Sequence, residues 1–318
     1  MRRSPLWWDV KEPAMLLGAA GLGMLVSLGW PDVTPTAARA ITPLLVVVLF
    51  TIFARVSLGR LREAARDGRY MLTVIGLNFG SAPVLAFLLG SFLLPDVPEL
   101  RVGLFLALLT PCTDWYLIFT HLVGGDVARN LAVLPWNLVL QVALLPVYLW
   151  LFTSAWLPVD MGEIGRALLT YAVVPLMAAQ LFRRWWGEQR LLARLGFWAL
   201  ALVVFAMFAS HGRIALAHPT LFLRLAPPFL LFYVLALALS QAVARGLRFP
   251  RERALALACT VMARNSPLVL PLAVVLFPEH PIIALSQLVE PIVEIPTLLL
   301  FSAVVRRGAA REVGAPRA

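Results

Sequence analysis

The stretch TPCTDW at residues 110–115 places a proline and several polar side chains in the middle of an apolar segment, and ARNSP at residues 263–267 does the same near the other end of the chain. Each stretch follows about ten to twelve residues of a predicted helix, which cover roughly 15–18 Å at ~1.5 Å rise per residue. That distance is about half of a ~30 Å hydrocarbon core. We therefore expect two helices that are broken near the middle of a lipid bilayer.

The composition is that of a membrane protein with many spans. Of the 318 residues, 61% are hydrophobic and 14% are charged, whereas soluble proteins carry about 25% charged residues. The first apolar segment lacks a signal-peptide cleavage site and is expected to be retained. Apolar runs long enough to cross a bilayer recur along the whole chain. They predict ten transmembrane helices, at residues 13–30, 38–58, 70–94, 101–123, 128–153, 163–182, 195–212, 220–244, 253–277 and 281–305.

The net charge of +10 comes from arginines in short loops between the apolar runs. If the N-terminus is cytoplasmic, 21 of the 27 Lys and Arg residues fall on the cytoplasmic side, five fall on the opposite side, and Arg264 lies within a helix. This asymmetry is the positive-inside pattern of membrane proteins. It predicts a multi-pass protein of the cell membrane with both termini in the cytoplasm, and it accounts for the basic charge without nucleic acid as a partner.

The ten predicted helices divide near Leu157 into two sets of five. Because five is odd, the second set enters the membrane from the opposite side, and the broken helices four and nine occupy equivalent positions. Paired broken helices in inverted repeats are typical of secondary transporters, whose substrate sites lie at the breaks. We therefore predict an all-α membrane protein with a first repeat at residues 1–157, a second at 158–307, and a disordered cytoplasmic tail at 308–318.

Four ionisable residues are predicted at membrane depth, where a charge is costly and usually functional. Two of them, Asp114 and Arg264, lie at the breaks. They could form a structural ion pair that holds the two helices together, or they could act as a gate or as ligands of a substrate.

The other two, Glu290 and Glu294, are four residues apart and share a face of the last helix. Two ionised carboxylates on one apolar face would repel each other, so one is expected to hold a proton. This favours a role in proton coupling, above all for the deeper Glu294. The alternative for Glu290 is hydration in an outer vestibule.

The remaining side chains at the breaks are candidate substrate ligands. Thr113, Asn265 and Ser266 offer oxygen and amide groups, although such residues also bond to their own helix or to a neighbouring one. Cys112 could be a small buried hydrophobe, or a soft ligand that suits a thiophilic substrate. No nucleotide-binding loop, zinc motif or catalytic constellation is present in the sequence. We therefore expect no cofactor, no bound metal and no enzymatic activity.

Five short stretches resemble a known family. PCT at residues 111–113, THL at 120–122 and GD at 125–126 are similar to the fourth helix of the arsenite-efflux branch of the bile acid/sodium symporter superfamily. VEIP at 293–296 resembles the VEVP of that branch's last helix, and NS at 265–266 resembles the broken ninth helix of the whole superfamily.

This resemblance implies ten helices in two inverted repeats, with helices 1, 2, 6 and 7 forming a panel and the others a core. It also implies that Cys112 matches the family's essential cysteine and Glu294 its essential carboxylate. Arsenite would then leave the cell in exchange for protons.

The chain departs from its relatives at three positions. Asp114 stands where the arsenite branch has a small or apolar residue, Arg264 where sodium-coupled members have a sodium-coordinating glutamine, and Thr260 where they have a sodium-binding glutamate. A cation at Arg264 would repel sodium, so no sodium coupling is expected there. The same arginine suggests an alternative substrate class, small organic anions. An intramembrane enzyme or sensor is a third alternative, which the missing constellations and the lack of a signalling domain disfavour.

Overall fold

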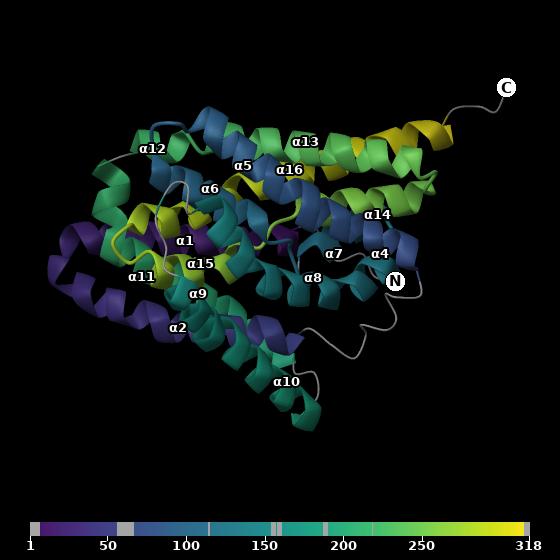
Figure 1. The fold of residues 1–318 in the computed structure, drawn as a ribbon. Coiled ribbons are helices and arrows are strands. Elements are labelled where there is room, and N and C mark those ends of the chain that lie inside the picture. Colours follow the sequence, from purple (N-terminus) through teal and green to yellow (C-terminus); the bar gives the residue numbers. More distant parts are fainter. Residues whose placement is uncertain are drawn as a thin grey trace. The chain divides into compact units, whose positions relative to one another are not determined.

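The computed structural model describes residues 7–55, 67–113, 115–153, 157, 161–186, 190–217 and 219–314, and every regular element in these ranges is a helix (Figure 1). The prediction of an all-α protein is confirmed for this part of the chain. The elements are α1 (Trp7–Gly29), η1 (Pro31–Val33), α2 (Thr34–Arg55), α4 (Gly68–Ile75), η3 (Gly76–Ser81), α5 (Ala82–Leu93), α6 (Pro98–Leu109), α7 (Trp115–Leu122), α8 (Val127–Tyr148), η4 (Leu149–Thr153), α9 (Met161–Leu168), η5 (Leu169–Val173), α10 (Val174–Trp186), α11 (Arg190–Ala217), α12 (Pro219–Leu223), α13 (Ala226–Gly246), α14 (Arg251–Met262), α15 (Ser266–Leu276) and α16 (Pro281–Gly314).

Seven helical segments in the described residues are long and apolar enough to cross a membrane. They are Thr34–Ala54, Gly68–Leu93, Val127–Phe152, Gly165–Trp185, Arg194–Arg213, Ala226–Gly246 and Pro281–Arg307. Each coincides with one of the predicted spans. The first predicted span has a shorter apolar stretch, Gly18–Gly29, and the fourth and ninth are each divided into two short helices. The crossing of all ten segments as two inverted repeats stays a prediction.

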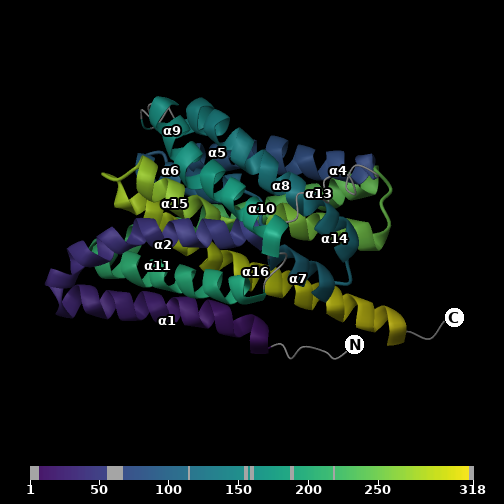
Figure 2. The same ribbon diagram turned by 90° about the horizontal axis from the view of Figure 1, so that it is seen from below.

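One compact unit contains α1, α2, α9, α10, α11, α15 from Pro267 onward and the start of α16. Within it α11 packs between α1 and α2, and α10 packs against α2 (Figure 2). The α1–α11 approach is close because Gly23 lies against the carbonyl oxygen of Phe205, where any larger residue would collide. These are the helices that the resemblance placed in the panel.

A second compact unit contains α4 to α8, α13, α14 and the part of α16 from Val289 onward. Within it α13 packs along α14, α5 packs along α6, and α14 also contacts α4, α7 and α8. The residues of α6 from Val102 to Leu109, and of α14 from Leu255 to Met262, are all buried. A helix that is buried on every side forms the interior of its unit, so α6 and α14 are the central elements here.

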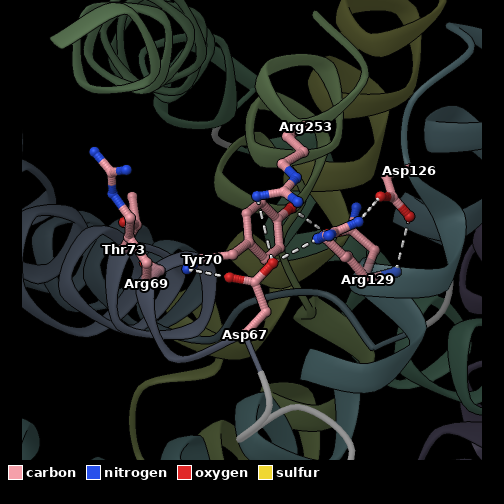
Figure 3. Close-up of polar contacts among 8 residues, drawn as sticks. Asp67, Arg69, Tyr70, Thr73, Asp126, Arg129 and Arg253 are labelled. Atoms are coloured by element: carbon pink, nitrogen blue, oxygen red, sulfur yellow. Dashed lines mark hydrogen bonds and ion pairs between the residues drawn. The ribbon is translucent and has the colours of Figure 1, made fainter. Parts of the chain in front are cut away.

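A polar cluster joins the first turns of α4, α8 and α14 in this second unit (Figure 3). Asp67 is the N-cap of α4 and accepts hydrogen bonds from the backbone N–H of Tyr70 (3.3 Å) and from Nε of Arg129 (2.7 Å). Nη1 of Arg253 lies 3.5 Å from the same carboxylate. Arg129 also pairs with Asp126, the N-cap of α8. The hydrogen bond from Arg129 lowers the pKa of Asp67 below its usual value.

A buried amide directly follows Arg129 on α8 and links four helices of the same unit. The Asn130 side chain accepts a hydrogen bond from the hydroxyl of Tyr70 (2.7 Å) and donates to Oγ1 of Thr120 (2.8 Å) and to the carbonyl of Ala256 (3.0 Å). Its backbone carbonyl accepts from the hydroxyl of Tyr116 (2.7 Å). Because each bond is buried, the network fixes α4, α7 and α14 relative to α8.

The last helix is longer than predicted. α16 continues through Gly314, so the first part of the tail, which was expected to be disordered from residue 308, is helical. The sequence AARE at residues 309–312 consists of strong helix formers, which explains the extension. Residues 315–318 lie outside the described residues.

Candidate functional site

Both predicted breaks are present, and they pair with each other inside the second unit. α6 ends at Leu109 and α14 ends at Met262, and the backbone is extended at the next positions, Thr110 and Ala263. The N–H of Cys112 donates to the carbonyl of Ala263 (3.0 Å), and the N–H of Asn265 donates to the carbonyl of Thr110 (2.9 Å). These two bonds form a short antiparallel bridge between Pro111 and Arg264. Each break thus supplies a partner for one backbone N–H and one carbonyl of the other break.

Arg264 is fully buried at this junction, and its guanidinium donates to oxygen atoms from three elements. Nη1 bonds to the carbonyl of Leu108 (3.1 Å), and Nη2 bonds to the carbonyl of Val261 and to Oδ1 of Asn78 (3.1 Å). Nε lies 3.5 Å from the carbonyl of Met262. All four acceptors are neutral.

The position of this charge follows from the two helix ends. The last carbonyls of a helix have no partner within the helix, and they carry the negative end of its dipole. Leu108 belongs to the last turn of α6, and Val261 and Met262 belong to the last turn of α14. The guanidinium of Arg264 therefore caps two helix C-termini at once. The ring of Phe232 on α13 adds a cation–π contact, with its centroid 5.1 Å from the guanidinium carbon.

Asn78, which also contacts the guanidinium, lies on the π-helical turn η3 (Gly76–Ser81) between α4 and α5. π-Helical turns inside α-helices are rare and frequent at functional sites. Asn78 is fully buried. We assign Asn78 to the site. No spacing pattern in the sequence had predicted this residue as part of it.

A carboxyl pair from α16 adjoins the second break. Glu290 and Glu294 are both buried, with 0% and 3% of their surface exposed, so the alternative of a hydrated Glu290 is not supported. Glu294 accepts a hydrogen bond from the backbone N–H of Arg264 (2.9 Å), which brings together two of the four residues predicted at membrane depth. One carboxyl oxygen of Glu290 accepts a hydrogen bond from the hydroxyl of Ser266 (2.7 Å). The other oxygen accepts a hydrogen bond from the hydroxyl of Tyr233 on α13.

The other predicted site residues are buried at the same junction. Nδ2 of Asn265 donates to Oγ1 of Thr113 (3.1 Å), which joins the two breaks through side chains as well as backbone. Cys112 is buried and is not in a disulfide. Asp114 lies outside the described residues, so its pairing with Arg264 stays a prediction.

Three further buried polar residues lie on the central helices of this unit. Asn137 on α8 approaches Oγ1 of Thr260 on α14, with 3.4 Å between donor and acceptor. Oδ1 of Asn137 and both amide atoms of Gln141 have no hydrogen-bond partner among the described residues. Sequence reasoning had missed Asn137 and Gln141, although an Asn and a Gln four residues apart in an apolar helix are a recognisable signal. No group of three His, Cys, Asp or Glu side chains in the described part of the chain could hold a metal ion.

Seven apolar helices and buried ionisable groups at two paired helix breaks define a multi-pass membrane protein with a polar centre. Residues 42–217 match the Sodium Bile acid symporter family. This match covers more than half of the chain, and the chain therefore belongs to that family of transporters.

The chain is also similar to individual proteins. The chain is 24% identical to the arsenical-resistance protein Acr3 of Corynebacterium glutamicum over 93% of its length and 85% of the relative's. It is 29% identical to the uncharacterized protein PA2026 of Pseudomonas aeruginosa over 66% of each chain. It is also 22% identical to the uncharacterized sodium-dependent transporter YocS of Bacillus subtilis over 52% of this chain and 51% of the relative.

Proposed function

We propose that the protein is a secondary active transporter of the cell membrane that exports arsenite in exchange for protons. The observation that carries the proposal is the junction of the two breaks, which buries a cysteine, Cys112, in the same unit as a carboxyl pair, Glu290 and Glu294. The similarity to an arsenical-resistance protein over 93% of the chain supports the choice of substrate. The loop arginines support cytoplasmic termini.

The chemistry assigns different roles to the two groups. Thiolates are soft ligands that suit thiophilic centres such as trivalent arsenic. The thiol of Cys112 would form an S–As bond with arsenous acid and release one water, without an oxidant or a reductant. Thr113 and Asn265 would form hydrogen bonds with the arsenic-bound hydroxyls, and the oxygen of Ser266, whose hydrogen is donated to Glu290, would accept a hydrogen bond from one of them. Glu294, supported by Glu290, would take up the proton that enters as arsenite leaves.

The alternative substrate class, small organic anions, depends on a guanidinium that can reach the ligand. Arg264 donates instead to three carbonyls and to Asn78 within the protein. An anion would have to compete with these bonds, so the geometry favours a neutral substrate such as arsenous acid over a carboxylate.

Uptake of arsenite by everted membrane vesicles that contain the protein tests the proposal. We expect Cys112→Ser to lower the uptake at least tenfold and Glu294→Gln to abolish its dependence on the pH gradient. Cys259→Ser is the matched control. Cys259 is also buried and not in a disulfide, but it lies inside α14 and not at a break. Uptake that is indifferent to both Cys112 and Glu294, or uptake of carboxylates that requires Arg264, would contradict the assignment.

A further inference from the structure

The two carboxyl groups of the site have different hydrogen-bond environments. Glu290 receives hydroxyl donors on both oxygens, from Tyr233 on one and from Ser266 on the other. Glu294 receives one backbone N–H, from Arg264. The two carboxyls are four residues apart on one face of α16, and both are buried. Two ionised carboxylates on one buried face would repel each other. At least one of the two groups therefore carries a proton.

The charges around the pair decide how many protons it holds. Among the described residues, the charged and titratable groups bonded to the pair are Arg264 at the second break, through its backbone N–H, and Tyr233 on α13, through its hydroxyl. With Arg264 positive and Tyr233 neutral, one ionised carboxylate makes the buried cluster neutral overall. Buried charges are tolerated when they are compensated and hydrogen-bonded. The resting state is thus a pair that shares one proton.

The donors decide which carboxyl is ionised. Hydrogen bonds donated to a carboxylate stabilise its charged form. Glu290 has two hydroxyl donors and Glu294 has one backbone donor, and bonds to charged acceptors are the stronger ones. We propose that Glu290 is the ionised member, that the exchangeable proton resides on Glu294, and that Tyr233 and Ser266 are positioning residues that fix this arrangement.

This inference rests on the proposed function for its physiological meaning. A transporter that exchanges protons needs one group that gains and loses the proton and a neighbour whose charge stays fixed. Tyr233 and Ser266 come from two different elements, α13 and the start of α15. A displacement of Tyr233 or of Ser266 would weaken the bonds to Glu290 and so change how firmly Glu294 holds its proton.

Infrared difference spectroscopy of the purified protein in nanodiscs tests the assignment without substrate or gradient. Protonated and ionised carboxyls absorb at different frequencies, and subtracting the spectrum of the Glu290→Gln, Glu294→Gln double variant isolates the pair. In a Glu294→Gln background only Glu290 remains to titrate. There we expect Tyr233→Phe to move the pH midpoint upward by about one to two units, the size expected for one lost hydrogen bond to a charged group.

The complementary background makes the test specific. In Glu290→Gln only Glu294 remains, and Tyr233→Phe should leave its midpoint within about 0.3 units because the hydroxyl bonds to Glu290. Ser266→Ala should repeat the pattern of Tyr233→Phe and provides a second variant if that one folds poorly. Tyr148→Phe is the matched control, since its hydroxyl bonds to the carbonyl of Phe79 in the same unit.

Equal shifts in both backgrounds, or no shift in the Glu294→Gln background, would overturn the proposal. A loss of stability without a change of midpoint would also overturn it, since a merely structural role has that signature. Failure of arsenite transport would leave these titrations unchanged, so the two proposals fail separately.

Discussion

Arg264 unites the two breaks because one side chain serves several carbonyls that would otherwise lie buried without a donor. Its planar guanidinium presents five N–H groups in a fixed fork, and it reaches oxygens on both helix ends and on η3. A lysine offers three donors from one point and cannot span these positions. The residue is thus specified by geometry as well as by charge.

We predict that Arg264→Ala destabilises the protein by about 3–5 kcal/mol, the cost of removing one partner from a buried ionic cluster. Arg264→Lys should recover only part of this loss. Free guanidinium ion at millimolar concentration should raise the thermal midpoint of the alanine variant, because it fits the space and the acceptors that the side chain leaves. Thermal unfolding in detergent, with and without the ion, measures both effects.

Arg224→Ala is the control for this experiment, because Arg224 pairs with Asp96 at an exposed position of the same unit. It should have a smaller effect and no response to guanidinium ion. An alanine variant of Arg264 that is as stable as the parent protein would show that the carbonyls do not depend on the guanidinium.

At the scale of elements, the breaks could be predicted because a proline beside polar side chains interrupts the backbone hydrogen bonds of a membrane helix at a definite position. The residues that contact the breaks could not be predicted from the sequence. Tyr233 stands in an aromatic, apolar stretch and reads as an ordinary core residue, and Asn78 lies on a π-helical turn that no spacing rule indicates. The acceptors of Arg264 are mostly backbone carbonyls. Every residue has one, so the residue types in a sequence do not show which carbonyls accept.

The cluster at the helix starts yields a prediction about pH. Asp67 caps α4 and pairs with Arg129, and its pKa lies below the usual value of about 3.9. A carboxyl with a lowered pKa stabilises the folded state above its ordinary pKa, and this contribution disappears as the pH falls through the lowered value. We therefore expect Asp67→Asn to lower the thermal midpoint at pH 7. At a pH below the lowered pKa of Asp67, the variant and the parent protein should have the same thermal midpoint.

Asp67→Ala separates the cap from the ion pair. Asparagine is also a good N-cap, whereas alanine is not, so the alanine variant should lose about 1 kcal/mol more at every pH. The ion pairs themselves are partly exposed and should contribute about 0.5–1 kcal/mol. A difference between the parent protein and Asp67→Asn that persists unchanged down to about pH 2 would contradict the assignment of the charge to Asp67.

At the scale of the whole molecule, hydropathy and the loop arginines were sufficient to predict a multi-pass helical protein, because a bilayer imposes length and charge rules on every span. The division into packing units does not follow the two sequence halves. One unit combines α1 and α2 with α9 to α11, and the other combines α4 to α8 with α13 and α14. Such a division depends on which helices pack, and only the resemblance to a family indicated it.

The coupling ion is a property of the whole transporter, and the charges at the junction predict it. Arg264 places a permanent positive charge among the oxygens at the helix ends, which would repel a sodium ion at that position. The carboxyl pair beside it can bind and release a proton. We therefore expect arsenite uptake by everted vesicles to stop when a protonophore removes the pH gradient. Replacing sodium with choline should change the rate less than twofold. A rate that falls with sodium removal and survives the protonophore would mean that a cation site outside this junction drives transport.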